Sequence, residues 1–246
     1  MLLESNYDGW TILDEVESTN TYLLNSAAAA GAVVFARSQT RGRGRQGRSW
    51  SARPGDSVIF SGLLEFAGGF SGERLRFLPL LAGAAVLRAA TADRSDEQKR
   101  AGDESDARED LQVKWPNDVY LRRQGRIGKV AGVLVESTVR AGRFRAVLGV
   151  GLNYRGPAPV VDAAPVPPAV LFSEQTLGDP IRRFGPRLVN AINELLPELY
   201  SDSREPPAFL RELRERNYLK DRVVSKNGRT FRAIDIADDG RLILED

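Results

Sequence analysis

The segment TRGRGRQGRSW, residues 40–50, places four arginines and three glycines directly before a tryptophan. Its glycines free the backbone to curl, so that successive N–H groups can point toward one anion. The side chains of Arg43, Arg45 and Arg48 add planar guanidinium groups, which suit phosphate or carboxylate. The spacing is not GxxxxGK[ST] and no helix is expected to follow, so the segment is neither a P-loop nor a dinucleotide-binding turn. The pattern predicts an anion-binding loop, with an Arg/Gly-rich RNA-binding loop as the alternative.

The amino-acid composition of the chain excludes several kinds of catalytic and metal site. The 246 residues are 42% hydrophobic and 28% charged, which is ordinary for a globular protein long enough to bury a large core. Lys+Arg (35) and Asp+Glu (33) nearly cancel, so no overall basic charge favours nucleic acid. The chain has no cysteine and no histidine, which excludes disulfides, thiolate zinc sites, Ser-His-Asp catalysis and imidazole metal sites. An enzyme of this composition must use charge, positioning and hard cations bound by oxygen.

The N-terminal residues 1–10, MLLESNYDGW, carry an early acidic residue and no apolar run, so we do not expect a signal peptide. We also expect no stretch to approach the roughly 20 apolar residues that a membrane span requires. Both features predict a cytoplasmic protein.

Hydrophobic patterning predicts a protein with both helices and strands. Apolar and β-branched runs predict strands at residues 32–37, 57–65, 111–115, 129–137 and 144–154. Helical spacing and end signals predict a helix that begins at Ser18, and further helices at residues 73–90, 181–200 and 206–217. The charged residues 93–110 predict a disordered surface loop, with a solvated helix extension as the alternative. The Asn-Gly and Asp-Gly turns within residues 221–246 predict a small β appendage.

Three further segments carry candidate site residues. In KWPNDVYL (114–121), the proline predicts a turn that offers the Asn117 amide and the Asp118 carboxylate between two strands. In GKVAGVLVES (128–137), Lys129 begins an apolar strand, and Gly132 lies inside it, where a ligand can come close. GVGLNY (149–154) ends near Asn153, a turn residue or a contact for a cation and phosphate. Taken singly, the first and third segments are better explained as ordinary turns, with the Lys114 side chain solvated in the first, and a β-bulge is the alternative for the second.

Taken together, these segments resemble the biotin protein ligases. The resemblance covers about residues 17–154 and is carried by ESTN (17–20), GRGRQGRSW (42–50), KWPND (114–118), KVAGVLVE (129–136) and GVGLNY (149–154), in that order. It implies an α+β fold with a mixed sheet flanked by helices, followed by a small SH3-like β domain. We expect a catalytic domain over residues 1–217 and a short SH3-like domain over residues 218–246. Since ESTN begins at residue 17, we expect the monofunctional type that lacks an N-terminal DNA-binding domain.

The resemblance also implies an activity. Members of this family combine biotin with MgATP to give biotinoyl-5′-AMP and pyrophosphate, and a lysine of a biotin carboxyl carrier domain then attacks the mixed anhydride. The implied cofactors are ATP and Mg²⁺, with biotin as the substrate and the carrier domain as the protein partner. No DNA or membrane partner is implied, and a homodimer formed through the sheet is a further expectation.

Position within the motifs implies a role for each site residue. A biotin pocket is implied at Ser18, Thr19, Asn20, Gln39, Gly42 and Arg43. Arg45 and Arg48 match arginines that close over the adenylate, and Trp50 packs the ordered loop. Lys129 matches the lysine that contacts the biotin carboxylate and the α-phosphate, Gly132 leaves room for the ligand, and Asn153 belongs to the nucleotide site. Asn117 and Asp118 match residues near the phosphate and the incoming lysine, with Asp118 as the candidate general base and Mg²⁺ ligand.

Other readings stay open at this point. A lipoate or octanoyl protein ligase would share the fold, although those relatives rely on a histidine motif, and some on a cysteine, that this chain lacks. A catalytically inactive biotin sensor and an RNA-binding Arg/Gly protein are further alternatives. The proline-rich residues 156–168 predict a surface loop where relatives cover the adenine, with Val170 and apolar neighbours packed there.

Overall fold

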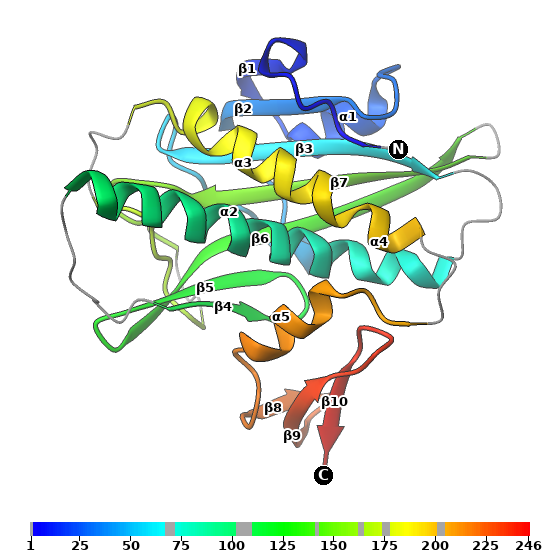
Figure 1. Ribbon diagram of the computed structural model, residues 1–246, viewed down its shortest axis with the longest axis vertical. Helices are drawn as coiled ribbons and strands as arrows, with labels where there is room; N and C mark the ends of the chain where they lie inside the picture. The colour runs from blue at the N-terminus through cyan, green and yellow to red at the C-terminus, as the bar shows by residue number, and fades with distance from the viewer. Residues whose placement is uncertain are drawn as a thin grey trace.

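The computed structural model describes residues 2–66, 72–101, 110–140, 143–161, 165–173, 178–200 and 205–246. A seven-stranded sheet forms the body of the molecule, and a separate three-stranded antiparallel sheet lies at the C-terminal end (Figure 1). In the large sheet, β1 runs parallel to β2 and the other neighbouring strands are antiparallel. The predicted mixed sheet with a small C-terminal sheet is therefore confirmed.

The two sheets and the helices are made of the following elements. The large sheet has the spatial order β1-β2-β3-β7-β6-β5-β4, with β1 (Thr11–Val16), β2 (Val33–Gln39), β3 (Ser57–Phe66), β4 (Asp110–Lys114), β5 (Asp118–Arg123), β6 (Arg126–Arg140) and β7 (Arg143–Asn153). The small sheet contains β8 (Val223–Lys226), β9 (Arg229–Ile236) and β10 (Leu242–Glu245). The α-helices of the described residues are α1 (Thr19–Asn25), α2 (Leu78–Ala101), α3 (Pro180–Leu195), α4 (Pro197–Tyr200) and α5 (Phe209–Glu215). Short 3-10 turns occupy Tyr7–Gly9, Arg45–Gly47 and Gly72–Phe77.

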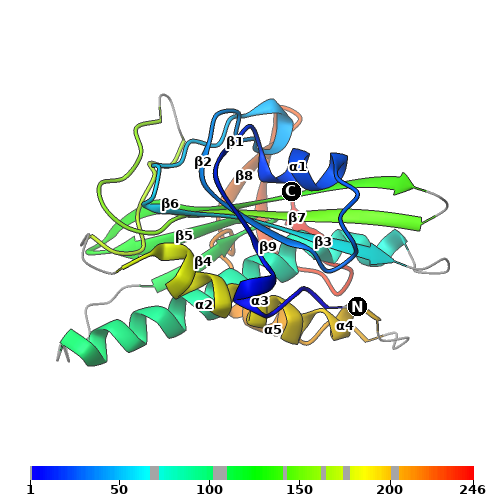
Figure 2. The same ribbon diagram turned by 90° about the horizontal axis from the view of Figure 1, so that it is seen from above.

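The helices cover the two faces of the large sheet unequally. Helix α1 lies on one face, over β2, β3 and β7, whereas α2 and α3 lie side by side on the other (Figure 2). Helix α1 begins directly after Ser18 because the Ser18 hydroxyl accepts a hydrogen bond from the Thr21 N–H, at 3.5 Å. This cap fixes the ESTN segment at the start of α1, on the face of the large sheet over which α1 lies.

The first half of α2 supplies much of the hydrophobic core. Leu78, Leu81, Val86 and Leu87 are fully buried against the sheet and the neighbouring helices. By length and composition alone, Glu73–Glu97 could cross a membrane, contrary to the expectation that no stretch would qualify. Of its apolar window, 67% is buried inside the protein, so this surface is already used within the fold.

The second half of α2 corrects the prediction of a disordered loop at residues 93–110. Helix α2 continues to Ala101, and its Asp93 side chain is completely buried (0% exposed). Asp93 accepts hydrogen bonds from the Tyr154 hydroxyl (2.7 Å) and from Arg183 Nε (2.9 Å), and Arg187 pairs with Asp96 (2.7 Å). The acidic residues of α2 therefore meet the arginines of α3, which the local charge pattern could not show. Residues 102–109 lie outside the described residues.

This network also shifts proton affinities. Burial, and then the hydrogen bond to Asp93, raises the pKa of the Tyr154 phenol well above its ordinary value. Burial opposes the charge of Arg183, but its hydrogen bonds to Glu97 and Asp93 outweigh that cost and hold its pKa above the ordinary value. At neutral pH the α2–α3 junction therefore holds Arg183 charged and Tyr154 protonated.

Other element boundaries differ from the predictions for local reasons. Strands β1 and β5 were not predicted because their apolar runs are short. Strand β1 is held by pairing with β2, and β5 by pairing with both β4 and β6. The helix expected over residues 181–200 divides into α3 and α4 at Pro197, which has no N–H to continue the ladder. Helix α5 begins at Phe209, later than the expected residue 206.

The small sheet contacts the large domain through the Asp-Gly turn between β9 and β10. The predicted Asn-Gly and Asp-Gly turns are present, with positive φ at Asn227, Gly228 and Gly240. The Trp115 indole N–H donates to the Gly240 carbonyl at 2.9 Å, and Arg76 pairs with Asp239 at 3.4 Å. The C-terminal turn therefore touches the segment that carries the KWPND motif.

Candidate active site

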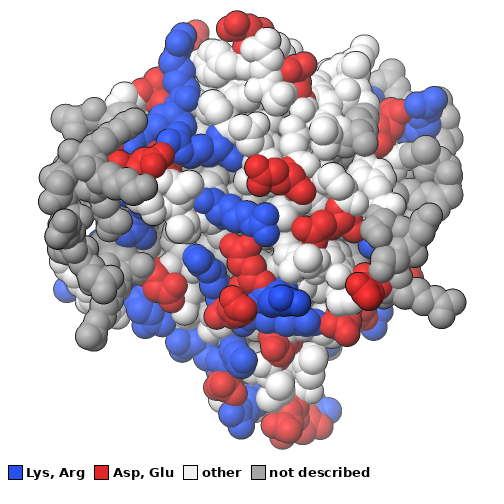
Figure 3. All heavy atoms as spheres, viewed as in Figure 1, with Lys and Arg blue, Asp and Glu red and all other residues white. Residues whose placement is uncertain are grey.

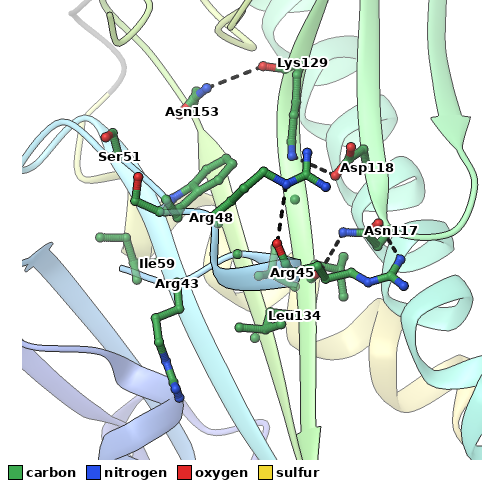
Figure 4. Close-up of a pocket in the computed structure, with 18 of the residues that line it drawn as sticks. Arg43, Arg45, Arg48, Ser51, Ile59, Asn117, Asp118, Lys129, Leu134 and Asn153 are labelled. Atoms are coloured by element: carbon green, nitrogen blue, oxygen red, sulfur yellow. Dashed lines mark hydrogen bonds and ion pairs between the residues drawn. The ribbon is translucent and has the colours of Figure 1, made fainter. Parts of the chain in front are cut away.

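A cavity of about 410 Å³ lies between α1, residues 40–50 and the ends of β5, β6 and β7. With the exception of Gly42, the site residues predicted from the sequence line it: Ser18, Thr19, Asn20, Gln39, Arg43, Arg45, Arg48, Trp50, Asn117, Asp118, Lys129, Gly132 and Asn153. Figure 4 shows that the labelled residues among them, which come from segments far apart in the sequence, surround one space: Arg43, Arg45, Arg48, Asn117, Asp118, Lys129 and Asn153. The fold thus brings together the motifs that carried the resemblance.

One end of the cavity, which we call the polar end, is formed by Ser18, Thr19, Asn20 and Gln39. The first three are buried, with exposures of 3–4%. The Thr19 backbone N–H donates to Gln39 Oε1 at 2.8 Å, which ties α1 to the end of β2. The Asn20 amide donates to the Leu134 carbonyl of β6 at 3.2 Å. Three elements of the fold therefore hold these hydrogen-bonding groups in place without a ligand.

Glycines on β6 and β7 make room beside these groups. A Cβ atom at Gly149 would collide with the Asn20 side chain, and one at Gly151 would collide with the Trp50 indole. A Cβ at Gly132 would lie 3.2 Å from Lys129 Nζ. Gly149 and Gly151 were not singled out from the sequence, although two glycines two residues apart must share one face of a strand.

Residues 40–50, the arginine loop, cover the mouth of the cavity. The loop is closed at its base, where the Trp50 N–H donates to the Gly42 carbonyl at 2.9 Å. This contact corrects the expected place of Gly42: a Cβ there would collide with the Trp50 carbonyl oxygen, so Gly42 shapes the base of the loop and does not line the cavity. At its tip, Gln46 and Gly47 have positive φ values of 58° and 73°.

Three of the four arginines of the loop, Arg43, Arg45 and Arg48, point in different directions. Arg43 turns toward α1 and pairs with Glu136 at 2.8 Å, while Arg45 donates to Asn117 Oδ1 at 3.0 Å. Arg48 extends over the cavity on the side of Lys129 and Asp118 (Figure 4). Arg45 therefore reaches the opposite wall, whereas Arg48 donates its hydrogen bonds within the loop, to the Arg45 carbonyl and to Gln46 Oε1, both at 3.4 Å.

The opposite wall carries a compact pair of opposite charges. Lys129 Nζ lies 2.7 Å from Asp118 Oδ1, and Lys114 Nζ lies 3.8 Å from Asp118 Oδ2. Asp118 is only 8% exposed, and its place is set by pairing opposite Lys114 on one side and Gly132 on the other. Lys114, for which a solvated side chain was the favoured interpretation, lines the cavity. We call Lys114, Asp118 and Lys129 the charged centre.

The environment of the charged centre is partly dry. Burial, and then the negative charge of Asp118, raises the pKa of the Tyr120 phenol well above its ordinary value. The Lys129 ammonium also lies 5.5 Å from the centroid of the Trp50 ring, within range of a cation–π interaction. Low polarity around the centre strengthens its electrostatic interactions.

The far end of the cavity is bounded by the proline-rich segment. Pro159, Val161, Pro165, Val166 and Pro168 line it, whereas Val170, expected there, does not. The segment is tied to the charged centre, because the Lys129 N–H donates to the Pro167 carbonyl at 2.8 Å. Asn153 Nδ2 donates to the Ala169 carbonyl at 3.1 Å, and its Oδ1 is buried with no hydrogen-bond partner in the described part of the chain. An aromatic amine on a ligand would satisfy that oxygen.

Comparisons with known proteins agree with this architecture. The family model "Biotin/lipoate A/B protein ligase family" matches residues 13–153. A biotin–[acetyl-CoA-carboxylase] ligase of Mycobacterium tuberculosis is 32% identical over 96% of this chain and 84% of its own length. A biotin–[acetyl-CoA-carboxylase] ligase of Paracoccus denitrificans is 33% identical to this chain. The matched region covers 66% of this chain and 62% of that protein. A structure of Aquifex aeolicus biotin protein ligase in complex with biotin and ATP matches the fold with a TM-score of 0.68 and 22% identity, covering 97% of this chain and 92% of that one. The family match and the sequence similarity show that the chain belongs to the biotin/lipoate A/B protein ligase family, and the fold agrees with this.

Proposed function

We propose that this chain is a biotin protein ligase that forms biotinoyl-5′-AMP from biotin and ATP and then transfers biotin to a lysine of a biotin carboxyl carrier domain. The observation that carries the proposal is one continuous cavity that joins the polar end to the charged centre beneath the arginine loop. Two relatives named for this reaction support it. A cytoplasmic location and a dimer through the sheet belong to the same proposal.

The polar end suits the ureido ring of biotin. That ring offers two N–H donors and one carbonyl acceptor, and hydroxyl and amide side chains supply the matching partners. Gly149 and Gly151 let Asn20 and the Trp50 indole pack close to β7, and both lie on the wall of the cavity that runs from the polar end to Lys129. The carboxylate of biotin would then reach the charged centre.

In the first step, a biotin carboxylate oxygen attacks the α-phosphorus of ATP, a new O–P bond forms, and the bond to pyrophosphate breaks. The barrier is largely electrostatic, since two anions must meet. Lys129, Arg45 and Arg48 would neutralise that repulsion, and one such donor in a dry site contributes about 3 kcal/mol, or a hundredfold in rate.

Magnesium would enter this site with the nucleotide. No group of three or more carboxylate, histidine or cysteine side chains that could hold a metal occurs among the described residues. Asp118, however, suits the usual Mg²⁺ arrangement of one or two carboxylates completed by phosphates and water. Bound there, Mg²⁺ would supply charge neutralisation at the phosphates.

In the second step, the carrier lysine must attack as a neutral amine. Its nitrogen forms an amide bond to the biotinoyl carbonyl carbon, and AMP leaves. Asp118 is placed to orient the amine and take its proton, because it lies at the mouth of the charged centre between two lysines. The arginine loop would keep water from the acyl-adenylate until the carrier arrives.

Exchange of labelled pyrophosphate into ATP tests the proposal directly. We expect exchange that depends on biotin, and transfer of labelled biotin to a carrier domain. Exchange that depends on lipoate and not on biotin would assign the chain to the other branch of its family.

The RNA-binding alternative makes a different prediction, namely steeply salt-dependent RNA affinity without exchange. The face formed by α2, α3 and α5 does not favour it, because basic and acidic groups alternate there (Figure 3).

A further inference from the structure

Two residues with no role so far, Ser61 and Glu136, make hydrogen bonds directly behind the polar end of the cavity. Ser61 lies on β3 and is fully buried (0% exposed), without lining the cavity. Its Oγ is 2.6 Å from Asn20 Oδ1 and 2.7 Å from Thr19 Oγ1. One serine hydroxyl therefore bridges two neighbouring residues of the proposed biotin site.

The chemistry of these groups fixes the direction of each hydrogen bond. Asn20 Oδ1 carries no proton, so the Ser61 hydroxyl must donate to it. The Thr19 hydroxyl has two neighbours that can accept its one proton, Ser61 Oγ at 2.7 Å and Gln39 Oε1 at 3.1 Å. With either acceptor the Thr19 proton is used within the protein, and the Thr19 oxygen is left as an acceptor toward a ligand.

Glu136 fixes the Asn20 amide in the same way. Glu136 Oε2 accepts from Asn20 Nδ2 at 2.9 Å, and the Leu134 carbonyl accepts from the same nitrogen. Both amide hydrogens of Asn20 are therefore used within the protein. Arg43 pairs with the Glu136 carboxylate at 2.8 Å and holds it in place. Asn20, like Thr19, is left with only acceptor capacity for a ligand.

Gln39 is oriented so that it can donate to a ligand, in contrast to Thr19 and Asn20. Its Oε1 accepts from the Thr19 backbone N–H at 2.8 Å, which directs its amide hydrogens away from Thr19. The polar end then offers acceptors on Thr19 and Asn20 and a donor on Gln39. This pattern matches a cyclic urea, with its two N–H groups and one carbonyl.

We propose that Ser61 and Glu136 are positioning residues that set the donor and acceptor pattern of the biotin site by orienting Thr19 and Asn20. The inference rests on the proposed function, because it takes the ureido ring as the ligand group recognised. It adds that the recognition depends on two residues outside the motif positions assigned to biotin. Neither residue contacts the nucleotide end of the cavity.

Calorimetry with biotin on the full chain tests the proposal, and the same strand offers a matched control. In Ser61→Ala, Thr19 and Asn20 each lose a partner, and we expect the Kd for biotin to rise about tenfold, the cost of one buried hydrogen bond left unmade. The KM for ATP in pyrophosphate exchange should stay within about twofold. Ser57 is also buried on the same face of β3, but its hydroxyl accepts from the Arg53 N–H, so Ser57→Ala should leave the Kd unchanged.

A second variant guards against a folding defect in the first. Glu136→Gln preserves shape at a partly exposed side chain but lets the Asn20 amide turn over, and we expect the Kd for biotin to rise several-fold. Because Ser61 acts through Asn20, the effect of Ser61→Ala should shrink in an Asn20→Ala background.

The outcomes separate the two proposals. Biotin binding by the unmodified chain that both Ser61→Ala and Glu136→Gln leave unchanged would overturn this inference alone. A rise in the KM for ATP equal to the rise in the Kd for biotin would also overturn it, since that pattern marks a general structural defect. Absence of biotin binding by the unmodified chain would overturn the proposed function together with the inference.

Discussion

The polar end and the arginine loop line the same cavity but are constructed in opposite ways. At the polar end, Thr19 and Asn20 are 3–4% exposed and are bonded to β2, β3 and β6. In the arginine loop, the Arg45 and Arg48 side chains are exposed, and Arg45 reaches the opposite wall through one hydrogen bond to Asn117.

This difference separates recognition from protection of the intermediate. A buried, fully bonded set of groups is arranged before the ligand arrives, so it discriminates between ligands with little reorganisation. A loop with few and exposed contacts opens at low cost, so it can admit two substrates and then cover their product. The charged centre lines the same cavity as the polar end and the arginine loop.

The largest effect is expected at the charged centre. We expect Lys129→Ala to lower biotin-dependent pyrophosphate exchange by at least about a hundredfold, because the cation between the two reacting anions is lost. Lys226→Ala, on the exposed face of β8, is the control and should keep full activity. Thermal unfolding of both variants checks the fold. Activity of Lys129→Ala near that of the unmodified chain would contradict the assigned role.

The rigidity of the polar end can be tested with one methyl group. In Gly149→Ala, the new Cβ would collide with the Asn20 side chain, and overpacking of this kind costs about 2 kcal/mol. We expect the Kd for biotin to rise about thirtyfold by calorimetry. The control, Gly83→Ala, adds a Cβ that meets Val113 at an ordinary 3.7 Å. Equal affinities in the two variants would show that the polar end yields easily.

The loop should respond differently from the polar end. In Arg45→Gly, the bond to Asn117 and one cation are lost, yet the groups that bind biotin remain. We expect the adenylate still to form but to escape about tenfold faster, because one charged hydrogen bond at an exposed side chain is worth about 1.5 kcal/mol, the low end of its range. Filtration of enzyme loaded with labelled adenylate measures the escape. Retention equal to that of the unmodified chain would refute the protective role of the loop.

The smallest expected effect concerns the dryness of the charged centre at high pH. The pKa of Tyr120 is raised in the folded state by burial and by Asp118, from an ordinary value of 10.0. A raised folded-state pKa gives stability that is complete below the unfolded-state pKa and is lost as pH rises above it. Urea unfolding should therefore show a free energy that falls between about pH 9 and about pH 11, and falls less in Tyr120→Phe. Tyr154 shifts in the same direction, so part of the fall should remain. An identical fall in both chains would contradict a dry centre.

Most site residues could be predicted from the sequence because each motif lies within a few consecutive residues. Glycines, arginines and the Asn-Asp turn carry their conformational and chemical meaning within a few residues, and the structure brings those at 18–20, 117–118 and 129 to one cavity. Five strands of the large sheet follow from apolar runs long enough to be recognised, whereas the mixed sheet itself was expected only from the family resemblance.

What could not be predicted depends on contacts between distant segments. Ser61 is one serine in an apolar strand, and its role appears only when β3 lies beneath α1. The charged end of α2 looked disordered because its partners, Arg183 and Arg187, lie about ninety residues away. Lys114 looked solvated because nothing local shows that strand pairing places it opposite Asp118.

The hydrogen bond from the Trp115 indole to the Gly240 carbonyl has a consequence for how the reaction can be observed. Trp115 precedes Asn117 by two residues and abuts the C-terminal turn, so its fluorescence senses both neighbours at once. A carrier protein that settles on the small sheet would alter the emission of this indole before any biotin is transferred. Of the three tryptophans, Trp10, Trp50 and Trp115, the last is the one hydrogen-bonded to the C-terminal turn, so a change in its emission would mark partner arrival before the chemistry.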